Sequence, residues 1–495
     1  MASQPYVDIM FGPLLPDFGG APNPEIPGYL VDALNVRYTP NGYRGMPTFS
    51  NVASATAIGS TGISSALGAC YYGATTTNFF VATNNGAMFE SRDEGIDTWQ
   101  DVSPATGTLD DKGDFMRFGL DIVYVCESRA PVVKSLGSSH ATVFASLGGS
   151  PPTVATGARV RNHAVFGGGV SNLYSIRTSA IGDHTDWPTP GSADARAKEA
   201  IQEDLNPEFG FVRRIVGGEK IGLIFQDSAI TRMTYIGGSA VYEFDTFERI
   251  DGQGTRLYSR PTSDGTLWYF YTDSGLYATD GYSVKSVSDG KVDESLFQNT
   301  ISDPYGSSLT RSFTSAFDQA RGNIIYGGNA NGGTARYQLV YNTQSGFLSL
   351  TNEANQVAVF NGYDEIGSGL RRPYVYNINY SDRKLQRLNG ATGTIGMQTG
   401  FIEIEPGWRV QIHGAHLLGT GVPGSLTLSY KAESDYDNLS AVQSGFTAMT
   451  AASRGNKATA RADAQFFSFR VAGTGAETQL IRGIRVYYEK TAPAT

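Results

Sequence analysis

Short apolar stretches separated by polar turns recur along most of the chain, and this pattern predicts β-strands joined in hairpins. Residues 78–91 (NFFVATNNGAMFES) and 267–280 (LWYFYTDSGLYATD) align without a gap as strand, threonine, two turn residues, glycine and strand. The turns TNNG (83–86) and TDSG (272–275) contain the residue types that adopt positive φ in tight hairpins. The two segments therefore indicate a repeated hairpin unit.

Five more segments carry related strands, which gives seven units spaced at roughly 40 to 60 residues, as propeller blades are. They cover residues 118–128, 163–179, 220–238, 323–350 and 373–388. One small sheet cannot bury both of its faces, whereas sheets stacked around an axis cover one another. We therefore predict a β-propeller of six or seven degenerate blades over residues 51–395.

The first fifty residues predict an extended arm. Five prolines lie among glycines in PLLPDFGGAPNPEIPGY (13–29), which disfavours helix. A strand-like piece and a Pro-Asn-Gly turn follow in residues 34–49. Such an arm has no core of its own, so it either lies across its own body or docks on a neighbouring subunit.

Residues 396–495 differ from the preceding repeats in their hydrophobic pattern, because apolar and polar positions alternate cleanly. This period of two predicts strands with one buried face, and several of them predict a small β-sandwich-like domain. The clearest alternating positions are Phe467, Phe469 and Val471, and then Ile484, Val486 and Tyr488.

The composition also indicates an all-β protein. The chain contains 60 glycines, 27 tyrosines and 26 phenylalanines, and only 17% of its residues are charged, against roughly 25% in ordinary globular chains. Glycines favour turns and aromatic residues favour strands. The best helix candidate, residues 192–205, has a Ser or Asp cap but few apolar positions, which predicts a short surface helix.

Charge and cysteine content exclude several classes of protein. A net charge of −9 disfavours a dedicated DNA- or RNA-binding role, since phosphates repel an acidic surface. Cys70 and Cys126 lie in apolar surroundings and are better interpreted as buried thiols than as a bridge. Residues 1–20 lack the features of a signal peptide, and no apolar run has the length of a membrane span, so we expect a soluble protein made in a cytoplasm.

The segment SRDEGIDTW (91–99) is one residue longer than the S-x-D-x-G-x-T-W box of many β-propellers, sialidases included. The box occurs once, whereas sialidases usually carry several. In propellers this turn is structural: its Asp bonds local backbone and its Trp packs between strands. We interpret 91–99 as a blade turn.

The chain contains arginines and paired glutamates of the kind that a glycan hydrolase uses, but their positions in the sequence do not indicate an active site. A sialidase needs three converging arginines, and the candidates Arg213, Arg214, Arg371 and Arg372 are scattered. The pair Glu403 and Glu405 is spaced to share one face of a strand, where glycosidase acids could sit. A solvated strand face explains that pair better.

Two histidine-containing segments also favour structural interpretations. His413 and His416 are three residues apart, so on a regular strand they point to opposite faces and cannot share a metal. In SAIGDHTDW (179–187), His184 lies between Asp183 and Asp186, where a turn fits better than a catalytic site.

No other motif indicates chemistry. The glycine runs at 167–169, 215–220 and 235–238 lack a Walker ending and a strand–helix context, and no G-x-S-x-G or Cys–His nucleophile motif occurs. We therefore predict no catalytic, cofactor-binding or metal-binding residues, no cofactor and no enzymatic activity.

Several segments, taken in order, resemble the tail nozzle or hub proteins of short-tailed bacteriophages. The resemblance covers most of the chain, although each motif is weak by itself, and residues 289–320 and 420–460 match nothing in the family pattern. The similar segments are residues 13–49, 179–195 with the pattern S-x-I-G-D-x-x-D-W, 213–255, 271–294, 461–473 and 481–490.

The resemblance implies a structural virion protein of the tail, assembled in the host bacterial cytoplasm. Six copies would form a ring that continues the portal–adaptor DNA channel, helps to retain the packaged genome and permits DNA ejection. Its partners would be further copies of itself, the tail adaptor or connector, tail fibres or spikes, passing viral double-stranded DNA, and the host surface. An acidic channel wall would let DNA pass without trapping it.

Two competing functions stay open at this stage. The first is a carbohydrate- or receptor-binding propeller of the tail, which specific sugar binding by an isolated monomer would favour. The second, less favoured, is a glycan hydrolase, which turnover of host polysaccharide would establish if it were lost on changing one carboxylate.

Overall fold

A computed structural model describes most of the chain between residues 5 and 493. The structure is 60% strand and 4% helix, which confirms the prediction of a nearly all-β protein. The description leaves out residues 53–55, 60–62, 64–65, 74–75, 93–97, 106–108, 111, 250–259, 273–274, 289, 293–313, 328–337, 352–355, 367–369, 422–424, 440–443 and 452–456 within that span.

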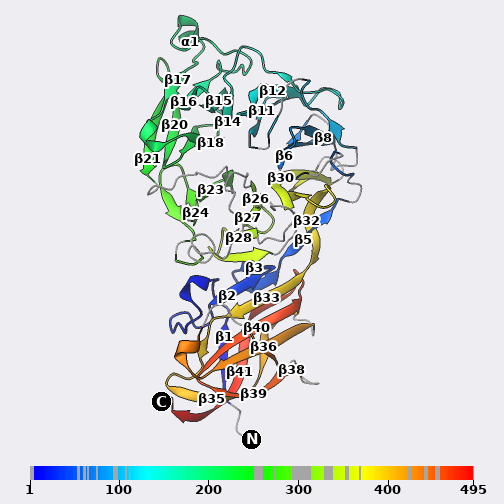
Figure 1. The fold of residues 1–495 in the computed structure, drawn as a ribbon, viewed down its shortest axis with the longest axis vertical. Helices are drawn as coiled ribbons and strands as arrows, with labels where there is room; N and C mark the ends of the chain where they lie inside the picture. Colours follow the sequence, from blue (N-terminus) through cyan, green and yellow to red (C-terminus); the bar gives the residue numbers. More distant parts are fainter. Residues whose placement is uncertain are drawn as a thin grey trace.

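Seven antiparallel units of four strands follow one another along the chain and occupy the upper part of Figure 1. The first three are β6 (Ala66–Tyr72), β7 (Thr77–Thr83), β8 (Met88–Arg92), β9 (Gln100–Asp101); β10 (Asp114–Phe118), β11 (Asp121–Cys126), β12 (Arg129–Ser135), β13 (Ala145–Ser146); and β14 (Val154–Val160), β15 (His163–Gly169), β16 (Asn172–Thr178), β17 (Gln202–Asp204).

The remaining four units complete the series. They are β18 (Val212–Gly217), β19 (Ile221–Gln226), β20 (Ala229–Gly237), β21 (Val241–Arg249); β22 (Thr262–Ser263), β23 (Trp268–Thr272), β24 (Gly275–Thr279), β25 (Val284–Ser286); β26 (Thr314–Asp318), β27 (Asn323–Gly327), β28 (Gln338–Asn342), β29 (Leu348–Thr351); and β30 (Gln356–Ile366), β31 (Leu370–Asn379), β32 (Leu385–Thr392), β5 (Pro47–Asn51). The fourth strand of the seventh unit thus comes from the other end of the chain.

The second strand of most units is strongly apolar because neighbouring units cover it on both faces. In β7, for example, every residue is buried. The predicted turn after β7 is present: Gly86 has φ +82° and its N–H donates to the Thr83 carbonyl at 3.1 Å. Residues 273–274 of the corresponding turn lie outside the described part.

Among the described residues, clusters of buried side chains lie between consecutive units, and one more lies between the seventh unit and the first. The seventh unit therefore also packs against the first. In order from the first pair of units, representative partners are Phe80 and Tyr124, Val125 and Phe166, Val165 and Ile224, Phe225 and Phe270, Tyr269 and Tyr326, Ile325 and Val359, and Tyr376 and Phe79.

Glycines permit the first strands of adjacent units to approach closely. A Cβ on Gly217 of β18 would lie 1.8 Å from the Arg159 carbonyl oxygen of β14. A Cβ on Gly68 of β6 would lie 2.3 Å from the Phe360 ring of β30, at the contact between the seventh and first units. Any larger residue would force these strands apart.

The lower part of Figure 1 contains a seven-stranded sheet and the strands that extend β26 to β29 into a ten-stranded sheet. The seven-stranded sheet consists of β1 (Tyr6–Met10), β3 (Val36–Thr39), β4 (Gly42–Gly45), β35 (Trp408–Thr420), β38 (Thr450–Ala451), β39 (Lys457–Ala464) and β41 (Leu480–Pro493). The ten-stranded sheet joins β26 to β29 with β2 (Leu30–Leu34), β33 (Thr394–Thr399), β34 (Ile402–Glu403), β36 (Leu426–Glu433), β37 (Thr447–Ala448) and β40 (Phe466–Thr474).

These two sheets share one hydrophobic cluster, and the alternating positions seen in the sequence supply it. Phe467, Phe469 and Val471 of β40 are buried against residues such as Val410 of β35 and Val486 of β41. Alternation of period two thus marks the inward faces of both sheets.

The N-terminal segment lies across its own body, the first of the two predicted alternatives. Strand β1 pairs with β41, β2 pairs with β33, and β5 pairs with β32. A single bridge, Leu34 to Leu350, links β2 to β29 and so joins the lower body to the sixth unit. Docking of this segment on a neighbouring subunit is still a prediction.

Helical structure is sparse. Helix α1 (Ala193–Ala197) begins after Ser192, whose Oγ accepts a hydrogen bond from the Ala195 N–H at 3.0 Å. It is shorter than the predicted segment, because residues 202–204 form β17. Short 3₁₀ helices lie at Pro16–Phe18, Pro207–Phe209 and Tyr436–Asn438. In the described part of the chain, no helix has the length and apolar character needed to cross a bilayer.

Candidate functional site

Within the predicted blade turn at residues 91–99, residues 93–97 lie outside the described ones. Its flanks have structural contacts. Ser91 and Arg92 end strand β8, and Trp99 packs against the cluster between the seventh and first units. The packing of Trp99 agrees with a structural turn.

The segment 179–187 is a turn stabilised by its own side chains. Asp183 Oδ1 accepts hydrogen bonds from the Thr185 N–H at 2.8 Å and hydroxyl at 2.7 Å. These bonds lower the pKa of Asp183 below its usual value. The Trp187 indole donates to the His184 carbonyl at 2.8 Å and stacks on Phe166. The geometry is that of a turn anchored by a tryptophan.

The remaining polar residues of this turn contact neighbouring elements. His184 Nε2 lies 3.4 Å from Asp121 Oδ2 in the second unit. Asp186 pairs with Lys198 at 2.8 Å. Asp183 and Asp186 thus have separate partners, and the turn connects the second and third units.

Glu403 and Glu405 each have their own structural partners. Glu403 Oε1 accepts a hydrogen bond from Gln465 Nε2 at 2.9 Å. Glu405 pairs with Lys490 at 2.6 Å and accepts from the Tyr488 hydroxyl at 2.9 Å, and these contacts lower its pKa. Glu405 is therefore held ionised by its neighbours, a poor state for a general acid.

The prediction that His413 and His416 point to opposite faces was wrong, because a β-bulge adds one residue between Ile412 and Gly414. His413 Nε2 lies 3.4 Å from Glu489, and His416 Nδ1 lies 3.3 Å from the Tyr487 hydroxyl. Glu489 and Tyr487 are two residues apart on β41, so both histidines share its outer face. Even so, no group of three metal-binding side chains occurs among the described residues.

The three candidate arginines whose side chains are described have separate partners. Arg213 pairs with Asp227 at 2.5 Å, whereas Arg214 is buried and faces Asp114. Arg372, far along the chain on β31, contacts the Tyr374 hydroxyl at 3.4 Å. The side chain of Arg371 lies outside the described part.

Neither cysteine forms a disulfide; Cys126 is buried and Cys70 is half-buried. The glycine runs at 167–169, 215–220 and 235–238 lie in or beside strands β15, β18 and β20, as expected for hairpin glycines.

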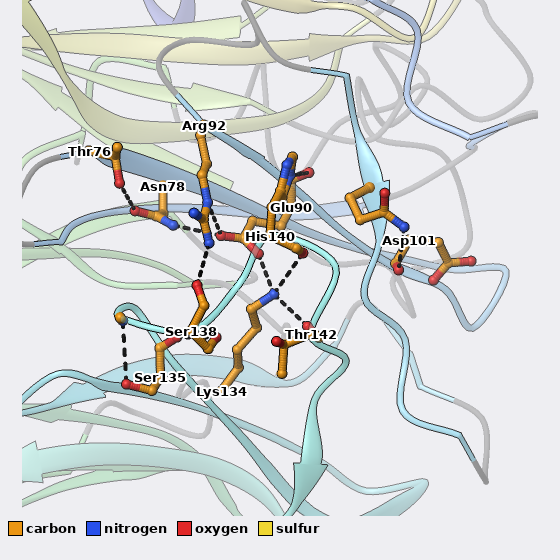
Figure 2. Close-up of polar contacts among 12 residues, drawn as sticks. Thr76, Asn78, Glu90, Arg92, Asp101, Lys134, Ser135, Ser138, His140 and Thr142 are labelled. Atoms are coloured by element: carbon orange, nitrogen blue, oxygen red, sulfur yellow. Dashed lines mark hydrogen bonds and ion pairs between the residues drawn. The ribbon is translucent and has the colours of Figure 1, made fainter.

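A polar cluster that the sequence analysis missed joins the first and second units (Figure 2). Glu90 of β8 and Lys134 of β12 form an ion pair, and both side chains are fully buried. Asn78 Nδ2 donates to Glu90 Oε1 at 2.6 Å, and Arg92 Nε donates to the same oxygen at 3.2 Å. The Glu90 carboxylate therefore has partners from its own sheet and from the next.

The ammonium group of Lys134 also has several hydrogen-bond partners. Lys134 Nζ donates to the carbonyl oxygens of His140, at 3.1 Å, and of Thr142, at 2.5 Å. Burial lowers the pKa of Lys134, and the bond to Glu90 opposes that shift. Lys134 thus has an acceptor for each of its three N–H bonds, namely Glu90 and two backbone carbonyl oxygens. The cluster connects two units and lines neither of the cavities described next.

A cavity of about 270 Å³ lies among the first strands of several units. The lining residues come from the first, second, fourth, sixth and seventh units and from the segment before the fifth, and include Tyr71, Asp114, Arg214, Arg260, Ser315 and Asn361. A second cavity of about 300 Å³ shares Tyr71 and Asp114 with it and extends to the third unit. The two cavities are adjoining parts of one central space.

One carboxylate faces two guanidinium groups in this space. Asp114 Oδ2 lies 3.5 Å from Arg214 Nη1, and Asp114 Oδ1 lies 3.6 Å from Arg260 Nη2. The Thr156 hydroxyl donates to Asp114 Oδ2 at 2.5 Å. The Ser315 hydroxyl donates to the backbone carbonyl of Arg260 at 2.7 Å, which fixes the backbone that carries this arginine.

A third polar cluster lies where the upper units meet the lower body. Arg321, in the turn after β26, donates from Nε to Glu477 Oε1 at 2.6 Å and from Nη2 to Glu477 Oε2 at 3.2 Å. Arg37 of β3 lies 3.3 Å from the same carboxylate. These bonds lower the pKa of Glu477. The cluster joins the sixth unit, the N-terminal segment and the lower body.

No protein-family model matches the chain, and no curated protein matches it significantly.

Proposed function

We propose that the chain is a structural virion protein, the tail nozzle or hub of a short-tailed bacteriophage. In this proposal the seven units form a β-propeller of seven blades, and the two lower sheets form a β-sandwich-like domain. A ring of six copies extends the portal–adaptor channel, helps to retain the packaged genome and opens for DNA ejection.

The cyclic order of the buried clusters carries the architectural part of this proposal. Each unit shares a core with the next and the seventh shares one with the first. Strand β5, from the N-terminal segment, supplies the outer strand of the last unit. A strand from the other end of the chain thus completes the last unit, which supports a closed propeller with protected edges.

The assignment to the phage tail rests on the segments that resemble, in the same order, the nozzle or hub family. The charge and the shape of the protein are compatible with this assignment. The chain carries a net charge of −9, which suits a conduit for DNA rather than a binder. The molecule is elongated, with both described ends of the chain in the lower body (Figure 1). Such a two-part subunit can contact an adaptor with one part and fibres with the other.

Electron microscopy tests the proposal directly. The purified full chain, alone and mixed with its adaptor, should form rings of six. Antibody against the chain should label the distal tip of short tails in the parent lysate. Absence of rings in both preparations would refute the proposal, and label on lateral fibres would favour a receptor-binding propeller.

A further inference from the structure

The outermost strand of the third unit has an acidic edge. All three residues of β17 are exposed, and they include Glu203 and Asp204. Glu208, in the 3₁₀ helix that follows, is exposed as well. The side chains of Glu203 and Glu208 form no ion pair or hydrogen bond with any described residue. The described part of the chain therefore does not neutralise the negative charge of this edge.

Exposed apolar side chains lie beside these carboxylates. Phe211, which follows the 3₁₀ helix, is 40% exposed, and Val170, in the turn between β15 and β16, is 63% exposed. Asn172 Nδ2 donates to Asp204 Oδ1 at 3.0 Å, which brings the Val170 turn to the end of β17. Arg213, whose guanidinium lies over the Phe211 ring, already has an ion-pair partner of its own. We call this surface the acidic patch; it consists of Val170, Glu203, Asp204, Glu208 and Phe211.

A second exposed patch lies on the outer face of the seven-stranded sheet. Tyr6 and Met10 of β1 are 51% and 53% exposed and lie on the same face of the strand as Asp8. The Arg485 guanidinium donates to both Asp8 carboxylate oxygens, at 2.6 and 2.7 Å, and lies over the Tyr6 ring. The Tyr487 ring lies beside that of Tyr6. Tyrosine, methionine and arginine are the residue types that protein–protein interfaces favour.

This second patch has a surplus of positive charge at Arg482. Arg482 is exposed, and the next residue, Gly483, pairs with Met10 where β1 meets β41. The side chain of Arg482 forms no hydrogen bond or ion pair with any described residue. Acidic residues of the same sheet face, in contrast, each lie beside a basic side chain; they are Asp8, Asp463 and Glu489. We call this surface the basic patch; it consists of Tyr6, Met10, Arg482, Arg485 and Tyr487.

We propose that the acidic patch of one copy docks on the basic patch of the next copy in the ring. Each patch combines exposed apolar side chains with an unpaired charge, and the two charges are opposite in sign. Strand β17 belongs to the upper units and β1 to the lower body (Figure 1), so the contact joins two different surfaces, as the contacts of a closed ring do. The contact also gives the N-terminal segment a role between subunits. This inference rests on the proposed function, since it names the surfaces through which the ring forms.

Sedimentation velocity of the purified full chain, alone and mixed with its adaptor, tests this contact. Arg482→Glu should weaken the assembly of copies about tenfold, because it places like charges opposite each other. Glu203→Lys/Glu208→Lys should weaken assembly for the same reason. A chain with all three substitutions has opposite charges again and should regain assembly. Raising the salt concentration should weaken assembly of the wild type, since salt screens exposed charges.

The matched control is Lys220→Glu. Lys220 is exposed, has no side-chain partner among the described residues and lies at the other end of β18 from Phe211. This variant should assemble as the wild type does, and circular dichroism checks that every variant is folded.

The outcomes separate this inference from the proposed function. Rings that form equally well in the wild type, Arg482→Glu and Glu203→Lys/Glu208→Lys would overturn the inference and leave the proposed function in place. Open filaments that Arg482→Glu disrupts would support the contact and refute the ring. A wild-type chain that does not associate in either preparation would refute both.

Discussion

The seven four-stranded units and the lower body bury the faces of their β-sheets in different ways. Most units share a small core with the next along the chain, which brings together residues that are close in sequence. The contact between the fifth and sixth units is instead part of the large cluster of the lower body. The lower body has one large core built from both ends of the chain, in which Ile9 and Val36 pack with Phe467 and Val486. The four-stranded units thus pack mainly against their neighbours in sequence, whereas the lower body packs together segments from both ends of the chain.

The difference extends to polar groups. The contact between the first and second units contains a fully buried ion pair, Glu90 and Lys134. In the lower body, ion pairs such as Arg409 with Asp463 lie at the surface. The upper contacts are therefore more sensitive to loss of a single charge, and the lower body to loss of packing.

Breaking the buried ion pair should produce the largest effect. Glu90→Gln leaves the buried Lys134 ammonium group without its ion-pair partner, which costs about 3–5 kcal/mol. Lys134→Met should cost less, because Glu90 still pairs with Arg92. The double variant Glu90→Gln/Lys134→Met should be more stable than either single variant. Urea denaturation measures each free energy of unfolding.

The matched control is Asp463→Asn, which breaks an exposed ion pair of the lower body and should have little effect. Equal, small losses in Glu90→Gln and Asp463→Asn would contradict the distinction between the two regions.

Forcing two adjacent units apart should have the next largest effect. In Gly217→Ala the new Cβ collides with the Arg159 carbonyl oxygen, which belongs to the neighbouring strand and cannot rotate away. We expect a loss of about 1–3 kcal/mol, the usual cost of overpacking. Hydrogen exchange should show the loss in β14 and β18 and not in β40.

The control is Gly137→Ala, where the nearest atom to a new Cβ is Ser135 Oγ at 3.9 Å. If both variants lose equal stability, close approach of the first strands is not what requires Gly217.

The sequence predicted repeated strands well because their side chains follow a simple period. The alternation at Phe467, Phe469 and Val471 directly reports a buried face, and the turn at Gly86 is a local feature. The pairing of β5 with β32 could not be predicted, since it joins residues more than 330 positions apart and no local pattern encodes it.

The candidate sites show the same limit. The bulge beside His413 is a backbone irregularity that residue spacing alone does not reveal. Glu90 and Lys134 did carry a signal: each lies two residues from buried apolar positions, Met88 for one and Val132 and Leu136 for the other. A charged residue at an inward position indicates a buried partner, but the identity of that partner requires the structure.

Lowering the pH should destabilise the contact between the third and fourth units more than it destabilises the lower body. His163, fully buried between the third and fourth units, donates from Nε2 to the Glu199 carbonyl and accepts from the Tyr242 hydroxyl at Nδ1. Burial lowers the pKa of His163, and the nearby Arg161 adds to this. The folded state therefore holds neutral histidine, while the unfolded chain takes up a proton below about pH 6.5.

Stability from His163 is thus complete above about pH 6.5 and is lost as the pH falls toward the folded pKa, by at most about 1.4 kcal/mol per pH unit. His163→Gln should flatten the slope of unfolding free energy between pH 6.5 and pH 5. His416→Gln, at a half-exposed site of the lower body, should flatten it less. A slope that is identical in wild type and His163→Gln would contradict this assignment.

The junction between the regions should be the least sensitive to a single charge. Glu477 is 39% exposed, so solvent and salt screen its bonds to Arg321, and Glu477→Gln should cost about 0.5–1 kcal/mol, less at high salt. The two regions are also joined by the bridge of β2 to β29 and by the continuous cluster that includes Tyr326 and Val36. Unfolding of Glu477→Gln, followed by circular dichroism and by hydrogen exchange, should therefore stay a single transition. Two separate transitions would mean that the ion cluster, and not the shared core, couples the units to the lower body.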